Sequence, residues 1–508
     1  MNEDRSHSSN RLPTAILSRR LSWLAVAVAL ALLATHAVTS GCDHDEVEHL
    51  HAAWMVSQGL VPYRDFLEQH HPALYYVLAP LARFFDGSPR TLVIAARFAN
   101  LAILATVLAV FLALARRVLD DRTAVWPSVL LVGCFFFLRN SFEVRPDPWM
   151  CALCLVALWQ WAGFLRDGRF WRSIIAGLCI GFAIVFLQKA IAFAGLLVVG
   201  TVLFALIARH PWRRLLGGGA VLAASSALPL LLLVLLVSRA GMWRDFTFWN
   251  YTFNRFYYFE TKFPGPSALA VLGVQIAEQP LLWLGGAGGL WLILRRRRAV
   301  AEKPELVLSA AVVVGIIVSL SRSRWPFSHN LLVLQPPLAL LATFALGSAR
   351  LHRARSALGA LALILVAKVG VLCFTYDENP GALQVQEHAL ALTGPSDPVA
   401  ISPPYHPIFR RDSFFFWYVP GYNAQAYAEC CRRYGCKHDN VERDDRSWLT
   451  QPPKLAYAPG GEPEYIPRDL EAHLSEFRST SLPGLWTRSA DALPVRNRVV
   501  AAGGAARP

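Results

Sequence analysis

The chain has 508 residues, of which 55% are hydrophobic and only 17% are charged, and its mean hydropathy is +0.37. This composition excludes an ordinary soluble protein and predicts an all-α, polytopic membrane protein. The net charge of +14 does not indicate a nucleic-acid partner, because most of the surplus lies in short loops between apolar runs, where it contacts anionic membrane lipids.

Long apolar runs recur from Leu21 to about Cys373, and a helix needs about 20 such residues to cross a bilayer. The first run, from Leu21 to Val38, is long and is not followed by a cleavage site and a soluble domain, so we interpret it as an uncleaved helix rather than a signal peptide. We predict about eleven spans, centred near Leu30, Leu104, Leu131, Val156, Gly181, Val199, Leu228, Leu284, Val314, Leu340 and Leu365.

Basic residues gather in alternate loops, which predicts the orientation of the chain. These loops are 116–122, 166–172, 209–214, 295–298 and 350–355, all on the same side as the N-terminus. The positive-inside rule makes that side cytoplasmic. We therefore expect a cytoplasmic segment (1–20), a transmembrane domain (21–375) and an extracytoplasmic C-terminal domain (376–508) that is small and of mixed or irregular structure.

The first external loop, residues 41–90, is the richest in chemical groups. Apolar residues repeat at helical spacing on both sides of GLVPYRDF, which predicts two helices lying at the membrane interface. Before the first of them, Asp43 to His51 include seven ionisable residues. They could simply begin a solvated helix, but an acid among them could also act as a general base. Asp45 and His49 share one helix face and could orient one another or hold a metal ion.

Further charged residues occur in the other external segments. Asp147 follows Arg145 at the start of the fourth span, where the pair fits a salt bridge or catalysis. Lys189 lies between two apolar runs and could snorkel or bind a phosphate. Arg64 and Arg324 are on the same predicted side, so these external cations together suggest an anionic ligand.

Three remaining features narrow the possible functions. Residues 243–264 interleave aromatic and basic side chains, which suits an interfacial belt or a substrate groove. Cys430, Cys431 and Cys436 in the tail could supply one disulfide in an oxidising compartment. Neither a P-loop nor a dinucleotide-binding glycine motif is present, which argues against nucleotide hydrolysis as the energy source.

The first external loop, DEVEHLHAAWMVSQGLVPYRDFLEQHHPALYYVLAPLARFFDGSP, resembles that of the dolichyl-phosphate-mannose protein mannosyltransferase and aminoarabinose transferase superfamily. The segments EVRPDP, FLQKAIAF, SHNLLVLQPPLALL and IFRRDSFFFWY extend the resemblance over most of the membrane part. It implies a type C glycosyltransferase fold and transfer of a sugar from a lipid phosphate, usually with inversion.

The resemblance also implies roles for individual residues. The catalytic carboxylate falls in the pair Asp45 and Glu46, and a second acid corresponds to Asp147. Aminoarabinose transferases have Glu-Lys-Pro where this chain has His70, His71 and Pro72, so His71 would bind phosphate only if protonated or by hydrogen bonding. His70 and His71 could instead contact a metal ion. Apart from the resemblance, we keep His49 and His70 as the candidate ligands of a divalent metal ion.

We therefore expect transfer from a polyprenyl-phosphate sugar to a glycan, lipid or protein acceptor on the extracytoplasmic face. Arg64, Arg145, Lys189, Arg324 and His71 are the candidate phosphate-binding residues. The Arg- and Ala-rich composition suggests a bacterial inner membrane and undecaprenyl phosphate as carrier. A transporter or flippase of a lipid-linked or anionic solute, and a polymerase or ligase of lipid-linked oligosaccharides, remain as alternatives.

Overall fold

The computed structural model describes residues 11–121, 123–261, 266–324, 326–348, 355–377, 379–436, 441, 452–457, 477–480 and 482–488. Position 122 and most of 350–355, both in predicted basic loops, therefore lie outside the described residues. The chain divides into two compact units. Unit 1 comprises 1–39, 97–235 and 262–377, and unit 2 comprises 40–96, 236–261 and 378–508. The long helices α4 (Pro89–Ala115) and α10 (Trp212–Arg239) run through the boundaries between them.

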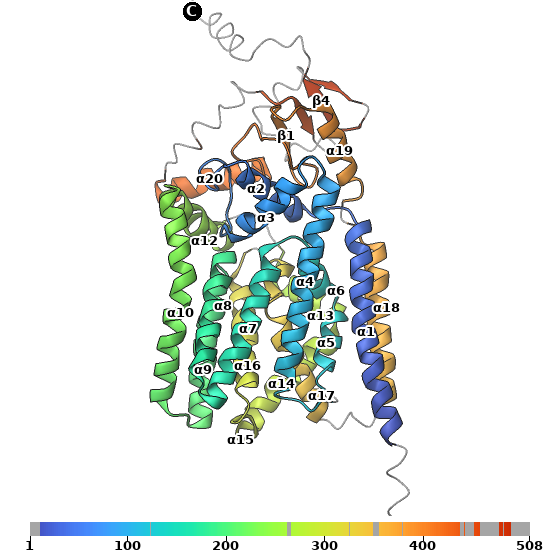
Figure 1. Cartoon of the computed structure of the whole chain (residues 1–508), viewed down its shortest axis with the longest axis vertical. Helices are drawn as coiled ribbons and strands as arrows, with labels where there is room; N and C mark the ends of the chain where they lie inside the picture. Colours follow the sequence, from blue (N-terminus) through green and yellow to red (C-terminus); the bar gives the residue numbers. More distant parts are fainter. Residues whose placement is uncertain are drawn as a thin grey trace, which may run out of the picture. The chain divides into compact units, whose positions relative to one another are not determined.

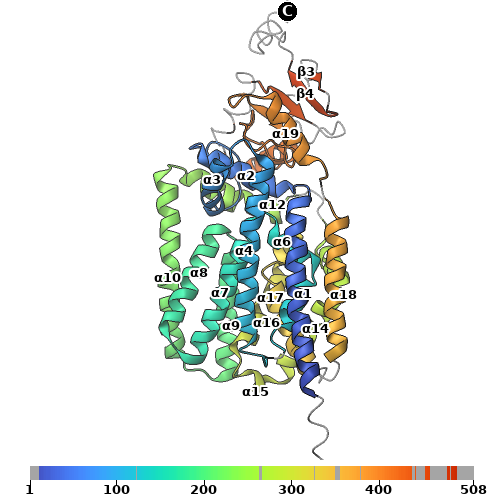
Figure 2. The same ribbon diagram turned by 45° about the vertical axis from the view of Figure 1, so that its right-hand side comes forward.

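Unit 1 is a bundle of long helices (Figure 1). Besides most of α4 and α10, it contains α1 (Arg11–Thr39), α5 (Trp126–Val132), α6 (Phe135–Phe142), α7 (Pro146–Asp167), α8 (Phe170–Phe186), α9 (Ala190–Ala208), α13 (Ala268–Glu278), α14 (Pro280–Arg295), α15 (Arg297–Val300), α16 (Pro304–Arg322), a 3-10 turn (Ser328–Leu331), α17 (Gln335–Ser348) and α18 (Arg355–Thr375). Helices α1 and α18 pack side by side, as Figure 2 also shows.

Six helices in the described part of the chain are long and apolar enough to cross a membrane, or seven if a bent pair counts as one span. The six are Arg20–Thr39, Pro89–Ala115, Pro146–Asp167, Ala190–Ala208, Trp212–Arg239 and Pro304–Arg322. Each predicted centre falls within a helix, but those near 131, 181, 284 and 340 lie in shorter ones, and the centre near 365 lies in α18, whose apolar stretch Leu361–Thr375 is shorter than a span. The chain is thus a multi-pass membrane protein, and the count of eleven spans stays a prediction.

Two of the predicted spans are broken, which the apolar pattern did not indicate. The span expected near Leu131 is divided at Gly133 and Cys134 into α5 and α6. The span expected near Leu284 is preceded by α13, and the axes of α13 and α14 meet at 106°. Pro280 explains this bend, because proline lacks an N–H and disfavours helical backbone at the preceding residue, Gln279.

Glycines allow α14 to pack closely against α17. A Cβ added at Gly286 would lie 2.1 Å from Leu338 Cδ1, and one added at Gly289 would lie 2.3 Å from the carbonyl oxygen of Leu341. Lipid tails give no hydrophobic drive for helix association, so such close packing is what holds the pair together.

The loops at one end of the bundle are linked to one another and are strongly basic. Arg166 donates to the carbonyl oxygen of Arg117 and pairs with Glu305 at 3.0 Å, while Lys303 donates to the carbonyl oxygen of Val118. Asp147 lies at the opposite end of α7. At about 1.5 Å per residue, the 22 residues of α7 separate these ends by about the thickness of a bilayer.

Unit 2 gathers three segments that the sequence places outside the spans. It contains α2 (His44–Ser57), α3 (Ala73–Phe84), α11 (Trp243–Thr247), a π-helix (Phe248–Phe253), α12 (Asn254–Phe259), α19 (Ala382–Leu392) and α20 (Pro420–Tyr434). Both predicted helices of the first loop are present, but α2 is not amphipathic as expected, because every residue from Glu46 to Met55 is buried. Buried side chains on all sides do not suit a helix lying at a lipid interface.

The tail contributes a small sheet to unit 2. Its strands β1 (Val399–Ile401), β2 (Leu455–Tyr457), β3 (Phe477–Ser479) and β4 (Leu485–Arg488) follow the order β1-β2-β4-β3, and only β1 and β2 are parallel. Val385 and Ala389 of α19 pack on the sheet and form its core with apolar strand residues. Cys431 and Cys436 form a disulfide, whereas Cys430 is a buried free thiol.

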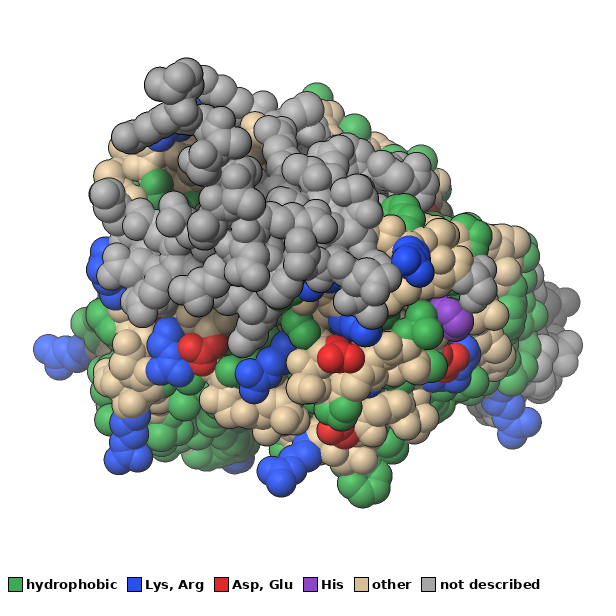
Figure 3. Space-filling model, turned by 90° about the horizontal axis from the view of Figure 1, so that it is seen from above, with side chains coloured by type: hydrophobic (Ala, Val, Ile, Leu, Met, Phe, Trp, Pro, Cys, Tyr) green, Lys and Arg blue, Asp and Glu red, His purple; other side chains and the backbone are tan. Residues whose placement is uncertain are grey.

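One end face of the molecule carries Lys, Arg, Asp and Glu side chains among hydrophobic ones (Figure 3). Exposed ion pairs in unit 2 join Arg90 to Glu387 at 3.0 Å and Arg433 to Glu260 at 3.1 Å. Such mixed charge is typical of a surface that meets water rather than lipid.

Candidate functional site

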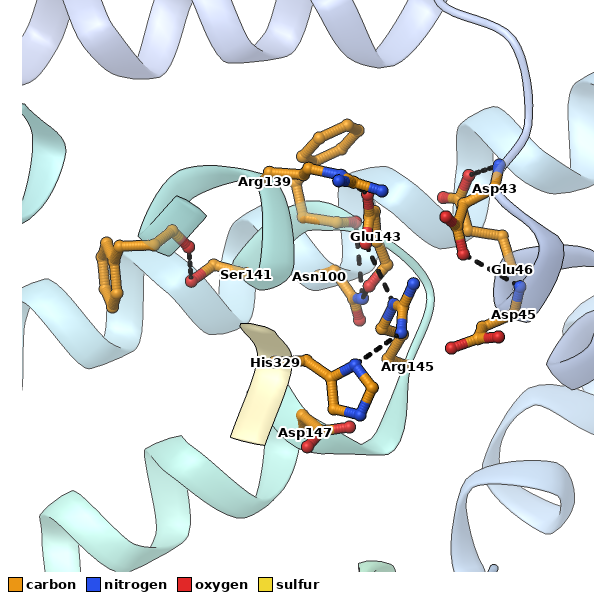
Figure 4. Close-up of polar contacts among 12 residues, drawn as sticks. Asp43, Asp45, Glu46, Asn100, Arg139, Ser141, Glu143, Arg145, Asp147 and His329 are labelled. Carbon is orange, nitrogen blue, oxygen red and sulfur yellow. Dashed lines mark hydrogen bonds and ion pairs between the residues drawn. The ribbon is translucent and has the colours of Figure 1, made fainter. Parts of the chain in front are cut away.

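The first helix of unit 2 begins at a capping box that orients the predicted catalytic pair (Figure 4). Asp43 is the N-cap residue, and its Oδ1 accepts from the backbone N–H of Asp45 at 2.9 Å. The carboxylate of Glu46 returns the bond by accepting from the backbone N–H of Asp43 at 3.1 Å. This reciprocal pattern satisfies two helix-end donors. Glu46 is fully buried, and its carboxylate takes part in the helix cap.

Asp45 is the acid of this pair that retains some exposure. Its Oδ1 accepts a hydrogen bond of 2.9 Å from the phenol of Tyr418 in the tail. Burial and the charge of Asp45 raise the pKa of Tyr418 well above its usual value, so the phenol keeps its proton and donates. The predicted base is thus held by a residue that sequence reasoning missed.

Four side chains of unit 2 form a group suited to a divalent cation. Glu48, His49, Glu68 and His70 each offer one ligand atom, and these atoms all lie within 4.8 Å of one another. Both histidines were predicted as metal ligands. The carboxylates were not, although Glu48 adjoins His49 and Glu68 lies two residues before His70.

The hydrogen bonds of this group orient its donor atoms. Glu68 Oε1 accepts from the backbone N–H groups of Gln69 and His70, and it lies 2.9 Å from His70 Nδ1. Glu68 Oε2 is buried and has no hydrogen-bond partner among the described residues. Burial opposes ionisation of Glu68, but the hydrogen bond and charge of His70 outweigh it and lower the pKa of Glu68. A buried carboxylate with one oxygen that accepts no hydrogen bond among the described residues is a suitable metal ligand.

Two predicted phosphate-binding residues of unit 2 have other partners. His71 is fully buried, packs against Phe246 and lies 3.2 Å from the hydroxyl of Tyr251 through Nε2. Arg64 is half-exposed and pairs with the adjacent Asp65 at 2.9 Å. These contacts give His71 the surroundings of a packed core residue, while Arg64 stays accessible.

Unit 1 contains a second cluster of charged residues, also drawn in Figure 4. Glu143 pairs with Arg139 at 2.6 Å and with Arg145 at 2.9 Å. Arg145 also donates from Nη1 to His329 Nδ1 at 3.0 Å, which leaves the ring proton of His329 on Nε2. The sequence had placed Arg145 beside Asp147 only, and it missed Glu143 and His329.

Asp147 and Lys189 form an ion pair in unit 1. Lys189 Nζ lies 3.3 Å from Asp147 Oδ1, and Asp147 is only 4% exposed. Lys189 is the residue before α9, and Asp147 lies in the first turn of α7. Arg324 is exposed and lies just beyond the end of α16. The sequence had considered Arg145 and Asp147 as a pair, whereas in the structure Arg145 pairs with Glu143 and Asp147 pairs with Lys189.

A third polar group, also unpredicted, links α2 to the tail of unit 2. His51 Nε2 lies 2.7 Å from Asp412, and His406 Nε2 lies 3.1 Å from the other oxygen of the same carboxylate. Burial and the charge of His51 lower the pKa of His406 to about 4, so this ring is neutral at pH 7. The pairing spans 361 residues between His51 and Asp412, and no local signal could have indicated it.

Comparison with known proteins supports the fold and the resemblance. Residues 69–238 match a family model described as dolichyl-phosphate-mannose-protein mannosyltransferase. No curated protein matches the sequence. Among solved structures, the chain is similar to ArnT from Cupriavidus metallidurans bound to undecaprenyl phosphate, with a TM-score of 0.67, 16% identity and coverage of 92% of this chain and 98% of that one.

The apo structure of the same Cupriavidus metallidurans protein is similar as well. Its TM-score is 0.64 at 15% identity, with coverage of 92% of this chain and 97% of that one. At such identity the likeness concerns the fold. The predicted type C glycosyltransferase fold is confirmed.

Proposed function

We propose that this protein is a membrane glycosyltransferase that transfers a sugar from a polyprenyl-phosphate donor. The observation that carries the proposal is Asp45, a partly exposed carboxylate at the start of α2 that is held by the Tyr418 hydroxyl. The fold shared with a protein bound to undecaprenyl phosphate, and the match of 69–238 to a mannosyltransferase family model, support the choice of reaction.

In the proposed reaction, Asp45 accepts the proton of the acceptor hydroxyl as a general base. The acceptor oxygen then forms a bond to the anomeric carbon of the sugar. The bond from that carbon to the phosphate oxygen breaks, and its electron pair leaves with the polyprenyl phosphate. Attack opposite the leaving group inverts the anomeric carbon.

The leaving phosphate gains a negative charge, so cations that bind it more tightly as it departs lower the barrier. Lys189 and Arg145 are our candidates for this role, with Arg64 and Arg324 as further, exposed cations. The unit 1 cluster suits an anion, because Arg139, Arg145 and Lys189 outnumber its acids Glu143 and Asp147.

We place the reaction on the extracytoplasmic face of a plasma membrane, which is the bacterial inner membrane if the source is bacterial. The connected basic loops around Arg117, Arg166 and Lys303 would then face the cytoplasm. Undecaprenyl phosphate is the carrier we propose for a bacterial cell, and the acceptor is a glycan, a lipid or a protein.

We also propose that Glu48, His49, Glu68 and His70 hold a divalent cation with nitrogen and oxygen ligands, such as Zn²⁺. Two buried carboxylates and two histidines point their ligand atoms at one another within 4.8 Å. Neutral histidines and carboxylates are ligands that Zn²⁺ accepts. Such an ion would fasten α2, which carries Asp45, to the segment that leads into α3.

The test is transfer of label from a lipid-phosphate sugar to acceptors in membranes containing the full-length protein, with products identified by mass spectrometry. We expect the Asp45→Asn protein to insert normally but to transfer sugar at least about 100-fold more slowly, which is the effect of removing a general base. Asp120→Asn is the matched control, because its carboxylate is exposed and belongs to the basic loop after α4. Full activity of Asp45→Asn would overturn the assignment.

A second candidate, a flippase or transporter, gains support from a polar group inside the bundle. Lys368 of α18 pairs with Glu278 at the bend between α13 and α14. Ionisable residues and broken helices within the membrane are typical of transporters. Glu278 also accepts from Cys134 Sγ and the backbone N–H of Phe135, so it satisfies the break between α5 and α6.

Measuring translocation of the lipid-linked sugar in proteoliposomes beside the transfer assay separates the two candidates. Loss of lipid-linked sugar translocation across proteoliposomes in Glu278→Gln, with no transfer by the unmodified protein, would favour the flippase. Transfer by the unmodified protein, with translocation indistinguishable from that of empty liposomes, would favour the enzyme.

A further inference from the structure

A loop of the tail, residues 406–419, reaches the helix that carries Asp45, and we call it the tail loop. Its residue Tyr418 donates to Asp45 Oδ1 at 2.9 Å. The carbonyl oxygen of Tyr418 accepts from Asn423 in the first turn of α20, which holds this end of the loop in place. Tyr418 is therefore held in place through α20, whereas Asp45 is held by the capping box at the start of α2.

The other end of the tail loop is attached to the same helix. His51 contacts the carbonyl oxygen of Ile408 through Nδ1 and the carboxylate of Asp412 through Nε2. Both nitrogens of a fully buried ring thus meet acceptors in one loop. Since His51 lies six residues after Asp45 on α2, the loop holds this helix at two points.

The middle of the tail loop is attached to the segment between α2 and α3. Trp417 donates from Nε1 to the carbonyl oxygen of Leu67 at 3.2 Å, and the backbone N–H of Leu67 donates to Phe415 at 3.3 Å. Trp417 also packs edge-on against His51. These contacts surround Tyr418 with fixed neighbours.

Two residues of the tail loop have left-handed backbone that their side chains disfavour. Ile408 has a φ of 61° and Val419 a φ of 41°, and both side chains are β-branched. Such conformations are strained and persist only where the surroundings enforce them. Ile408 contacts His51, and Val419 follows Tyr418, so the strain lies at the two attachment points.

From these contacts we infer that Tyr418 is a positioning residue for the base of the glycosyl transfer. The inference rests on the proposed function of Asp45. A donor held on Oδ1 restricts rotation of the carboxylate and aims its other oxygen, and orientation of a reacting group contributes to rate. Tyr418 acts through Asp45 and does not itself exchange a proton, because its raised pKa keeps the phenol protonated.

The test measures kcat and KM for the lipid-phosphate sugar with the purified full-length protein in nanodiscs. Tyr418→Phe removes only the hydroxyl, and we expect kcat to fall about tenfold, the size expected for one lost hydrogen bond, with an unchanged KM. Tyr434→Phe is the matched control, because its phenol donates to Glu260 from α20. We expect it to keep both constants.

A double-mutant cycle distinguishes positioning from general stabilisation. If Tyr418 acts through Asp45, adding Tyr418→Phe to Asp45→Asn causes no further loss of the residual rate. Independent losses that multiply, or a change in KM alone, would overturn the inference. An unmodified protein without transferase activity would instead overturn the proposed function, so the two failures can be told apart.

Discussion

Lys189 and Asp147 form an ion pair across 3.3 Å, joining the start of α9 to the first turn of α7. The sequence had assigned the first of them to phosphate binding and the second to catalysis. Their pairing means that Lys189 needs no ligand to offset its charge, and a phosphate would compete with Asp147 for it.

Replacing Lys189 with Met should lower kcat by about 10-fold to 100-fold, because one cation less stabilises the charge that develops on the leaving phosphate. It also leaves Asp147 buried and unpaired. The double variant Lys189→Met with Asp147→Asn removes this second effect, so comparing its kcat with that of the single variant separates the two causes. Arg213→Met, an exposed change in the first turn of α10, is the control and should keep kcat. Full activity of Lys189→Met would exclude a role in transfer.

The metal proposal predicts that the purified protein contains a divalent cation in equal amount to the chain. Glu68→Gln should reduce the metal content at least tenfold, because the carboxylate whose Oε2 lacks a partner loses its charge. Inductively coupled plasma mass spectrometry of the purified protein measures this directly. Glu387→Gln changes an exposed acid of α19 and should leave the content unchanged. Equal metal in both variants would contradict the assigned ligands.

The buried His406 predicts a pH-dependent stability of unit 2. Its pKa falls from 6.5 to about 4 on folding, so the unfolded chain binds more protons between these values and the folded state loses stability as pH falls from 6.5. The loss reaches up to about 3 kcal/mol by pH 4. The lowered pKa of Asp412, where the charges of His51 and His406 overcome burial, acts in the same direction at lower pH.

Differential scanning fluorimetry from pH 7.5 to 4 measures this effect. The melting temperature should fall with pH, and it should fall less in His406→Asn, whose amide oxygen can replace Nδ1 as acceptor for the backbone N–H of Ile408. Parallel curves for the two proteins would show that His406 does not contribute.

The close approach of α14 and α17 predicts an asymmetry between neighbouring glycines. Gly289→Ala should destabilise the protein by about 1–3 kcal/mol, since its Cβ would lie 2.3 Å from a backbone oxygen that cannot move aside easily. In Gly288→Ala, the nearest atom, the Cβ of Ala345, would be 3.5 Å away. Thermal unfolding of both variants tests this, and similar melting temperatures would contradict the packing described.

Much of the fold follows from the sequence alone. Hydropathy predicted a helix at every expected centre, because an apolar helix satisfies its backbone hydrogen bonds internally and can therefore lie in lipid. Asp45 was predicted to be the base from an acid-rich segment after an apolar run and from the resemblance of the first loop, and this assignment stays a prediction. The bend at Gln279 was missed although Pro280 was visible, because an apolar pattern reports burial in lipid and not the direction of the backbone.

Other features were decided by the tertiary structure. Tyr418 meets Asp45, Asp412 meets His51, and Glu68 completes a group with His49, although only the last pair is close in sequence. Side-chain contacts of this kind depend on how loops close over long separations, and no periodicity records them. The sequence thus determined the membrane helices and pointed to Asp45 as the candidate base, while folding decided which partners hold that carboxylate, because orientation requires neighbours that only packing brings together.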